Sequence, residues 1–419
     1  MKKIRLLHAA DLHLGAPMEC LPGELGAAER ALCAGATHAA WRQLVQVAVE
    51  EEVDLVVLAG DTLDGEAPLE ARRWLVEGLE ELAAEEIPTV LVAGEGDCLS
   101  SSVWSGFELP AGSTLLTPEH PEFLVRRGGR VVVSVVGYSR DPAVEGSRLP
   151  SARRRDPEHE DAVQVAVRHG TVTAERRVGD LRGALRLREV ERSGLDAWLL
   201  GSAHRHRTWS EADPLIHDPG CAQARWPRET GLRGCSLIEW ADGRSRPPKC
   251  RFRPLGPVAW HAQAVELSTA QTLESEVRRV VQEIDGELPR EVELVLLHLS
   301  VRGGLASSRS RFENALRKAL GERFGDRVIL GPPAMEVLPT PAREGIPAES
   351  FAEAVLEEQS RAGTEGGQEA LRATVQELLD RAGLPEKIWP AELAPAQNLE
   401  ELLSLATAEA LWALTLEDA

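Results

Sequence analysis

Two short stretches near the amino terminus carry side chains that could hold a divalent metal ion. Asp11 and His13 follow the apolar run at residues 4–7, and Asp61 ends the run that begins at residue 54. A carboxylate and an imidazole two residues apart, joined by a carboxylate from a neighbouring strand, suit a borderline ion such as Mn²⁺, Fe²⁺ or Zn²⁺. An ion held in this way could assist hydrolysis of a phosphoester. One Asp-x-His pair alone would not favour this interpretation, because any α/β protein can place polar residues at strand ends.

Three further segments carry more candidate ligands, and they follow in chain order. Glu95 and Asp97 lie in the first, His169 in the second and His204 in the third, each beside at least one glycine. A set of five such segments in one chain is much more specific than any one of them. We therefore interpret them together as a metal site.

The elements expected around these segments alternate between strands and helices. A helical stretch at residues 41–51 precedes an apolar run at 54–59, and another at 72–85 precedes a run at 89–93. This repetition predicts an α/β domain with a parallel or mixed sheet covered by helices. Ligands of such a sheet collect at the carboxyl ends of its strands, where the candidate residues stand.

Composition limits the possible partners. The chain of 419 residues is 43% hydrophobic and has a formal net charge of −20, so it can bury a large core but has no generally basic surface for nucleic acid. Any DNA contact must therefore be local, as in residues 201–260, where ten Arg and Lys stand against six Asp and Glu. Each basic run taken singly is also typical of a solvated loop.

Cysteine spacing and hydropathy indicate the compartment. The six cysteines include no CxxC pair, so neither a disulfide framework nor a zinc ribbon is expected. The amino terminus is strand-like, and no apolar stretch reaches the length of a membrane span. We expect a cytoplasmic protein with reduced thiols and no membrane contact.

A second domain is expected after a proline-containing segment. Residues 244–254 have the features of a connecting or edge segment, because prolines interrupt a regular ladder. The pattern beyond it predicts a βαβαβ unit, with strands at 261–267, 292–301 and 328–330 and helices at 269–284 and 311–324. The expected domains are therefore residues 1–258, 259–340 and 341–419.

The third of these segments is predicted to be a helical tail. Asn398 and Glu401 form a capping box, and residues 399–414 place leucines on a broad apolar face without any Lys or Arg. An apolar face of this kind is normally buried against another protein surface. Packing onto its own chain and docking to a partner remain two alternatives.

Taken in order, the five segments resemble the motifs of the calcineurin-like metallophosphoesterase superfamily. Longer matches, at residues 6–15, 53–64, 87–94 and 219–235, resemble its bacterial DNA-repair exonuclease branch, the SbcD/YhaO-like nuclease subunits. The resemblance covers roughly residues 1 to 255. It implies a four-layer sandwich of two mixed sheets flanked by helices, followed by a small α+β capping domain and the helical tail.

The same resemblance implies one or two divalent ions, with Mn²⁺ expected. The first ion would be held by Asp11, His13, His204 and a bridging Asp61, and the second by Asp61, His169 and Glu95. Asp97 and Asp64 fit the family pattern as residues that orient loops and ligands rather than bind metal.

The sequence departs from the family at three positions. The usual Gly-Asn-His-Asp stands here as residues 94–97, with Glu95 for the asparagine and Gly96 for the histidine that serves as general acid. The usual Gly-His-x-His stands as residues 201–204, with Ser202 in place of a histidine. A register two residues longer would instead pair His204 with His206. We prefer the ungapped register, which leaves His206 as a loop residue or a substitute ligand or acid.

Three functions follow from the resemblance and its departures. The first is a metal-dependent DNA phosphodiesterase, an exonuclease subunit for double-strand break repair, with a homodimeric state and an SMC-like coiled-coil ATPase bound through the C-terminal helices. The second is a catalytically impaired DNA-binding or scaffolding subunit of such a complex, because losing a positioned acid costs about 10²- to 10⁴-fold in rate. The third is a phosphatase of the same superfamily.

Overall fold

The computed structural model describes residues 3–65, 67–141, 155–173, 185–211, 213–244, 247–268, 271–303, 309–331 and 334–337. By its contacts the chain divides into two compact units. The first comprises residues 1–261 and 288–297, and the second comprises residues 262–287 and 298–419. The candidate metal ligands all belong to the first unit.

The first sheet of unit one has six strands in the order β14-β13-β1-β2-β3-β4. Strands β1 to β4 are parallel, whereas β13 and β14 add an antiparallel hairpin at one edge. The strands are β1 Ile4–Ala9, β2 Leu55–Ala59, β3 Thr89–Val92, β4 Ser113–Leu115, β13 Arg233–Arg244 and β14 Lys249–Leu255.

The second sheet also has six strands, in the order β11-β12-β10-β7-β6-β5. Its four central strands are parallel and its two edge strands are antiparallel to their neighbours. The strands are β5 Glu122–Arg127, β6 Arg130–Tyr138, β7 Val163–His169, β10 Ala197–Gly201, β11 Arg207–Ser210 and β12 Leu215–Asp218. Two short strands, β8 Val172–Thr173 and β9 Leu185–Arg186, pair separately.

Alternation along the strands creates the layers. In β1 the fully buried Leu6 packs into the core shared by the two sheets, whereas its neighbour Leu7 packs into the core beneath the helices. Val57 and Val56 of β2 divide in the same way. Successive side chains of a strand point to opposite faces of the sheet. Because both faces of this sheet are covered, its central strands must be apolar on both faces. The expected pair of mixed sheets flanked by helices is confirmed.

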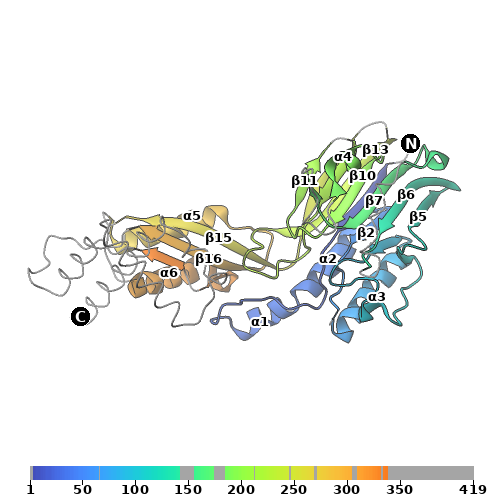
Figure 1. Ribbon diagram of the computed structural model, residues 1–419. Coiled ribbons are helices and arrows are strands. Elements are labelled where there is room, and N and C mark those ends of the chain that lie inside the picture. The colour runs from blue at the N-terminus through green and yellow to red at the C-terminus, as the bar shows by residue number, and fades with distance from the viewer. Residues whose placement is uncertain are drawn as a thin grey trace, which may run out of the picture. The chain divides into compact units, whose positions relative to one another are not determined.

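Helices α1 Ala27–Ala34, α2 Ala36–Glu50 and α3 Leu69–Ala84 belong to the first sheet, and the short α4 Leu187–Glu191 belongs to the second. Figure 1 shows α2 and α3 side by side on the outer face of the first sheet. They approach closely at Gly78, where a Cβ atom would stand 2.4 Å from the Trp41 ring. The Trp41 indole N–H donates to the Trp74 carbonyl oxygen at 2.8 Å, which satisfies its one donor in the core.

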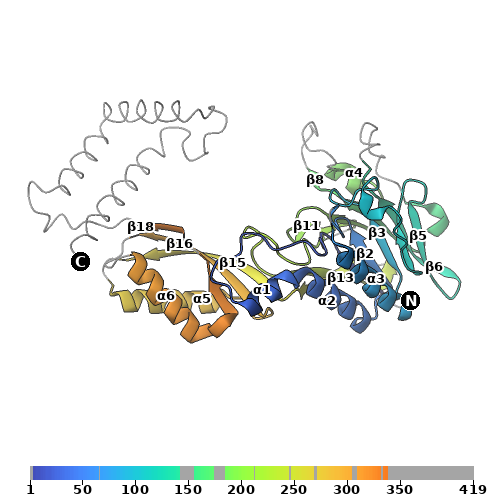
Figure 2. The same cartoon turned by 90° about the horizontal axis from the view of Figure 1, so that it is seen from below.

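A third sheet contains β15 Val258–Leu267, β16 Leu294–Gly303, β17 Val328–Leu330 and β18 Ala334–Val337. Helices α5 Leu273–Glu287 and α6 Arg309–Phe324 pack together on one face of this sheet (Figure 2). The order strand, helix, strand, helix, strand agrees with the expected βαβαβ pattern, and β18 is an additional strand. Three turns of 3₁₀ helix complete the described elements, at Ser102–Trp104, Pro157–His159 and Gly325–Arg327.

Residues 249–254 of the proline-containing segment lie in edge strand β14, which agrees with the edge alternative, while Pro247 and Pro248 stand between β13 and β14. Pro254 is tolerated there because an edge strand has one side without ladder partners. The domain limits at residues 258 and 340 stay predictions. The predicted tail at residues 341–419, including its capping box and apolar face, lies outside the described residues.

Within the described residues, no helix has both the length and the apolar character needed to cross a membrane.

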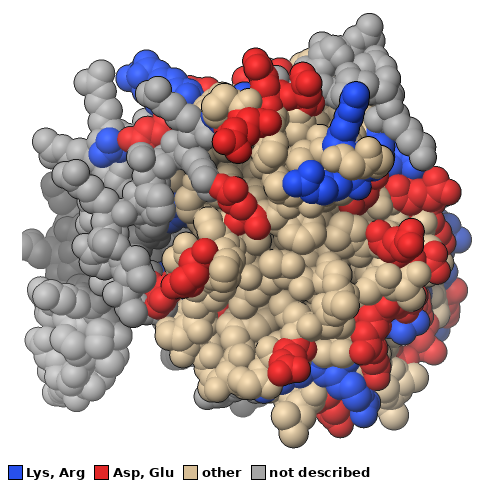
Figure 3. All heavy atoms as spheres, turned by 90° about the vertical axis from the view of Figure 1, so that its right-hand side faces the viewer, with Lys and Arg blue, Asp and Glu red and all other residues tan. Residues whose placement is uncertain are grey.

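Figure 3 shows one face of the first unit, where acidic and basic side chains lie in small separate groups around a broad uncharged area. This face therefore offers no continuous basic surface to a polyanion.

Candidate metal centre

The candidate ligands meet at the carboxyl ends of parallel strands from both sheets. Asp11 and His13 follow β1 and Asp61 follows β2, while His169 ends β7 and His204 follows β10. Their side chains form two groups in which the possible ligand atoms lie within 4.8 Å of one another. The site is thus made by bringing the ends of two sheets together.

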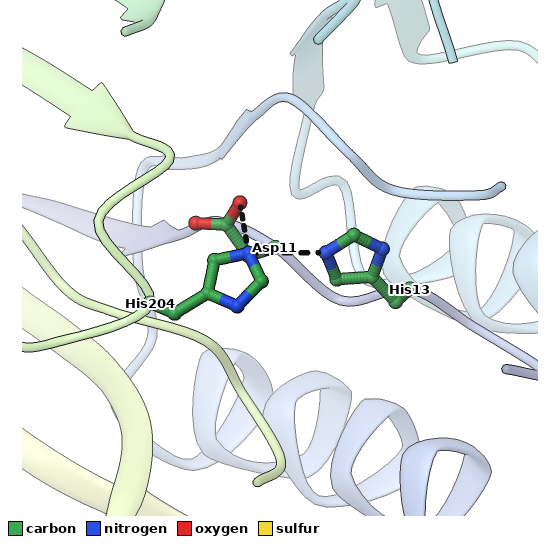
Figure 4. Close-up of side chains that lie close together, drawn as sticks. All are labelled: Asp11, His13 and His204. Atoms are coloured by element: carbon green, nitrogen blue, oxygen red, sulfur yellow. Dashed lines mark hydrogen bonds and ion pairs between the residues drawn. The ribbon is translucent and has the colours of Figure 1, made fainter. Parts of the chain in front are cut away.

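The first group consists of Asp11, His13 and His204 (Figure 4). His204 Nε2 lies 3.5 Å from Asp11 Oδ1 and 3.4 Å from His13 Nε2. Asp11 is 1% exposed and His13 is 6% exposed, whereas the His204 side chain is 27% exposed, so the group is open to solvent on the His204 side. A carboxylate and two imidazoles facing one point are suitable ligands for a borderline divalent ion.

The second group consists of Asp11, Asp61 and His169. His169 Nε2 lies 3.4 Å from Asp61 Oδ2, and His169 Nδ1 lies 3.9 Å from Asp11 Oδ1. Asp61 Oδ2 is also 3.9 Å from His13 Nε2, which belongs to the first group. The bridging role expected of Asp61 stays a prediction, and in the structure Asp11 is the residue shared by both groups.

Each of the three histidines is oriented by a partner on its Nδ1 atom. Nδ1 of His13 donates to Asp64 at 2.6 Å, Nδ1 of His169 to the Ala59 carbonyl oxygen at 3.0 Å, and Nδ1 of His204 to Glu229 at 2.7 Å. In the neutral form of a histidine ring, such a bond leaves Nε2 as the nitrogen without a proton. Partners of this kind fix the ring orientation and raise the basicity of a metal ligand.

Asp97 positions the loop that carries Asp61. Its carboxylate is fully buried and accepts backbone N–H groups from Asp61 at 3.1 Å, Thr62 at 2.9 Å and Gly94 at 2.6 Å. The Gly96 N–H in turn donates to Asp61 Oδ1 at 2.7 Å. The loops after β2 and β3 are therefore held together by two carboxylates.

Two glycines make room for these ligands. A Cβ atom on Gly94 would stand 2.2 Å from Asp61 Oδ1, and one on Gly60 would stand 2.5 Å from His169 Nδ1. Gly60 also has a φ of +91°, in the region that favours glycine. Any larger residue at either position would displace a candidate ligand.

Backbone strain is concentrated at the same place. Eight non-glycine residues of the described chain have positive φ, and five of them belong to the site: Asp11, His13, Asp61, Ser202 and His204. Such conformations cost roughly 1–3 kcal/mol each and persist where the surrounding structure imposes them. Their concentration here indicates that ligand placement, rather than stability, determined these loops.

The buried carboxylates of the site create a strongly negative interior. Burial and the nearby Asp218 raise the pKa of Asp11 well above its usual value. Burial likewise raises the pKa of Asp97 and of Asp218 to about 7. Burial also lowers the pKa of His169, which keeps its ring neutral. These shifts indicate a place where a cation would be favourable.

The residues present fit a divalent ion. Asp11 Oδ1 is buried and has no hydrogen-bond partner within the described part of the chain, although it lies at the centre of both groups. An unpaired buried carboxylate oxygen is costly unless something neutralises it. Asp11, His13 and His204 would hold one ion, and Asp11, Asp61 and His169 could hold a second.

Two of the residues named from the sequence lie apart from these groups. The Glu95 carboxylate pairs with the Arg140 guanidinium and is more than half exposed. His206 is exposed, and its ring packs 4.9 Å from the His217 ring and 5.2 Å from the Phe252 ring. The arrangement agrees with the ungapped register, in which His204 is a ligand and His206 is a loop residue.

Sequence reasoning missed several residues around the first group. Glu229 is 5% exposed and accepts N–H groups from Arg225 at 2.6 Å and Trp226 at 3.2 Å as well as the bond from His204. Although burial opposes its ionisation, these bonds lower the pKa of Glu229 to about 2. Asp218 accepts the Ala203 N–H at 3.2 Å beside Asp11. The only signal in the sequence is the position of Glu229 within the glycine-containing segment at 219–235.

The two histidine registers make different predictions for metal binding. We expect His204→Ala to weaken Mn²⁺ binding by at least about 10-fold, because one of three inward-facing imidazoles is lost. His206→Ala should leave binding unchanged, since its ring packs on His217 and Phe252 instead. Titration calorimetry measures both. Weaker binding by the His206 variant as well would favour the longer register, which uses both histidines.

The raised carboxylate pKa values predict how metal stabilises the protein at different pH. Asp97 and Asp218 bind protons more tightly in the folded chain than in the unfolded chain. Their contribution to stability is therefore present below about pH 4 and is lost as pH rises through about 7. The positive charge of a nearby divalent ion would offset the loss of these protons, so Mn²⁺ should raise Tm more at pH 8 than at pH 6. Differential scanning fluorimetry at both values tests this, and an equal gain would contradict it.

Comparisons with known proteins agree with this site. A family model described as calcineurin-like phosphoesterase matches residues 4–225, a range that contains every residue of both groups. The chain is 26% identical over 307 residues to YhaO of Bacillus subtilis (strain 168), described as an uncharacterized metallophosphoesterase. That alignment covers 72% of each protein.

Two solved structures are similar to part of the chain. A dimetal phosphatase from Danio rerio is 12% identical with a TM-score of 0.32, and the match covers 59% of this chain and 98% of that one. A purple acid phosphatase from yellow lupin (Lupinus luteus) seeds is 12% identical with a TM-score of 0.34, over 60% and 54% of the respective chains.

Proposed function

The chain belongs to the calcineurin-like phosphoesterase family, and from this premise we propose that it hydrolyses phosphodiester bonds of DNA with the aid of bound Mn²⁺. The observation that carries the proposal is the pair of ligand groups sharing Asp11 at the rim of two sheets. A bound divalent ion supplies charge neutralisation on the phosphate and lowers the pKa of a water molecule. The chain itself supplies the ligand geometry, the exclusion of water and the contacts to substrate.

The loop that supports His204 provides groups suited to a nucleic acid. Arg225 Nη1 lies 3.8 Å from Asp64 Oδ2, at the edge of the first ligand group. The exposed Arg228 guanidinium stands 5.5 Å from the centre of the Trp226 ring. Arginine side chains neutralise phosphates, and an indole can stack with a base regardless of sequence. The Trp226 ring supports a substrate with bases, whereas the arginines suit any phosphate ester.

The proposal is tested with three substrates and one variant. With Mn²⁺, the wild type should cut 5′-labelled double-stranded DNA and bis-(p-nitrophenyl) phosphate, but not p-nitrophenyl phosphate, which is a monoester. Asp11→Asn should cut none of them. Hydrolysis of the monoester with intact DNA would instead identify a phosphatase.

A scaffolding role is the second candidate, because the site lacks parts that efficient hydrolysis uses. Gly96 has no side chain to protonate a leaving group, and Ser202 replaces an imidazole. Loss of a positioned acid costs about 10²- to 10⁴-fold. If the protein binds Mn²⁺ and DNA with wild-type affinity yet cuts no diester over hours, this second function is correct.

We also propose a cytoplasmic homodimer that binds an SMC-like coiled-coil ATPase through the C-terminal segment. The proposal rests on the acidic, apolar sequence at residues 398–416 and on the resemblance of the first 255 residues. Deleting residues 397–419 should leave Mn²⁺ binding intact and abolish co-purification with the ATPase. Loss of cooperative melting in the truncated chain would show that this segment belongs to its own core.

A further inference from the structure

Arg140 occupies the side of the site where the family ligands are missing. The Glu95 carboxylate, at the position of the family asparagine, pairs with the Arg140 guanidinium instead of joining the second ligand group. The neighbouring Gly96 still donates to Asp61 Oδ1 at 2.7 Å. The loop at residues 94–97 therefore contacts Asp61 through the Gly96 N–H. The Glu95 side chain of the same loop points to the surface and holds Arg140.

The backbone of Arg140 is held at the rim from two directions. Its N–H donates to the Ala93 carbonyl oxygen at 2.9 Å, and its own carbonyl oxygen accepts the Leu99 N–H at 2.9 Å. On the other side, β6 runs parallel to β7 with Tyr138 opposite Arg168, so the residues after Tyr138 lie beside His169. Arg140 thus stands between the loop that contacts Asp61 and the strand end that carries His169.

The charge of this arrangement favours a phosphate. Arg140 is 22% exposed on its side chain and Glu95 is 58% exposed, so the guanidinium is shielded while its carboxylate partner faces solvent. A guanidinium offers a planar fork of donors that matches two phosphate oxygens, and a phosphate can displace an exposed carboxylate from it. The cost of moving Glu95 into water is small because it is already largely there.

We propose that Arg140 binds a phosphate oxyanion of the substrate on the His169 side of the site, and that Glu95 holds the guanidinium in position until substrate replaces it. This inference rests on the proposed function, since it deepens substrate binding at the same centre. A positively charged side chain would then neutralise phosphate charge where Glu95 and Ser202 replace metal ligands of the family and Gly96 replaces its general acid.

Inorganic phosphate and Mn²⁺ are the probes that test the proposal, both by calorimetry. With Mn²⁺ bound, Arg140→Gln should weaken phosphate binding at least about 10-fold and raise KM for DNA similarly, with Mn²⁺ stoichiometry and Tm unchanged. Arg140→Lys should recover part of the binding, because it keeps the charge but loses the fork. Arg42→Gln is the matched control, since Arg42 pairs with Glu81 on the helical face.

Glu95→Gln separates this proposal from the alternative that Glu95 is a metal ligand. We expect tighter phosphate binding, by several-fold, and unchanged Mn²⁺ stoichiometry. Loss of a bound Mn²⁺, unchanged phosphate binding by Arg140→Gln, or no phosphate binding by the wild type would each overturn the proposal. Arg140-dependent phosphate binding without DNA cleavage would instead contradict only the proposed function.

Discussion

Replacing Asp11 with asparagine is expected to remove tight Mn²⁺ binding from the whole site. Asp11 is shared by both ligand groups, and its Oδ1 is the buried oxygen without a partner among the described residues. An amide supplies no negative charge, so the loss should exceed the roughly 10- to 100-fold effect typical of altering an outer partner of a ligand. In the wild type, Asp11 Oδ2 accepts the Ser202 N–H at 2.9 Å. The side-chain oxygen of asparagine can accept the same bond, so the fold should persist.

Calorimetric titration with Mn²⁺ measures this loss, and Asp161→Asn, at an exposed turn of the same unit, is the control. Asp61→Asn is expected to have a smaller effect, because it belongs to one group only. Undiminished binding by the Asp11 variant would remove the basis of the metal assignment. Complete loss by the Asp61 variant would restore Asp61 as the bridging residue.

Replacing Asp97 with alanine is expected to lower the free energy of unfolding by about 3–5 kcal/mol. The three closest backbone N–H groups on its carboxylate, those of Asp61, Thr62 and Gly94, would lose their acceptor in the interior. Each buried donor without a partner costs about 1–3 kcal/mol, although removing a buried carboxylate offsets part of the total. Mn²⁺ affinity should fall as well, because the loop carrying Asp61 loses its anchor.

Urea unfolding of the metal-free protein, followed by tryptophan fluorescence, tests this prediction. Asp97→Asn keeps one acceptor and should lose less stability. Asp64→Ala provides the contrast, because Asp64 is partly exposed and its carboxylate supports one histidine rather than a network of backbone groups. Equal stability of the alanine and wild-type proteins would show that solvent or another group satisfies these donors.

Much of the fold could be predicted from local patterns. Apolar alternation and helix-period runs indicated a mixed sheet covered by helices and the strand and helix order near residues 258–330, within a few residues at each end, whereas the second sheet was implied only by the family resemblance. The strand Val328–Leu330 was placed at its observed limits. Such patterns are reliable because the order of apolar and polar residues along a strand or helix reflects which of its faces are buried. Only the pairing with β13 showed that residues 249–254 of the proline-containing segment form an edge strand.

The sequence by itself determined which residues could serve as ligands, because Asp11, His13, Asp61, His169 and His204 stand at strand ends whose direction the α/β pattern dictates. Only the tertiary structure decided how they are used. It made Asp11 the shared carboxylate, supplied Glu229 from 25 residues beyond His204, and paired Glu95 with Arg140 from 45 residues away. The reason is physical: strand ends follow from local periodicity, whereas the partner of a buried charge depends on which loops two packed sheets bring together.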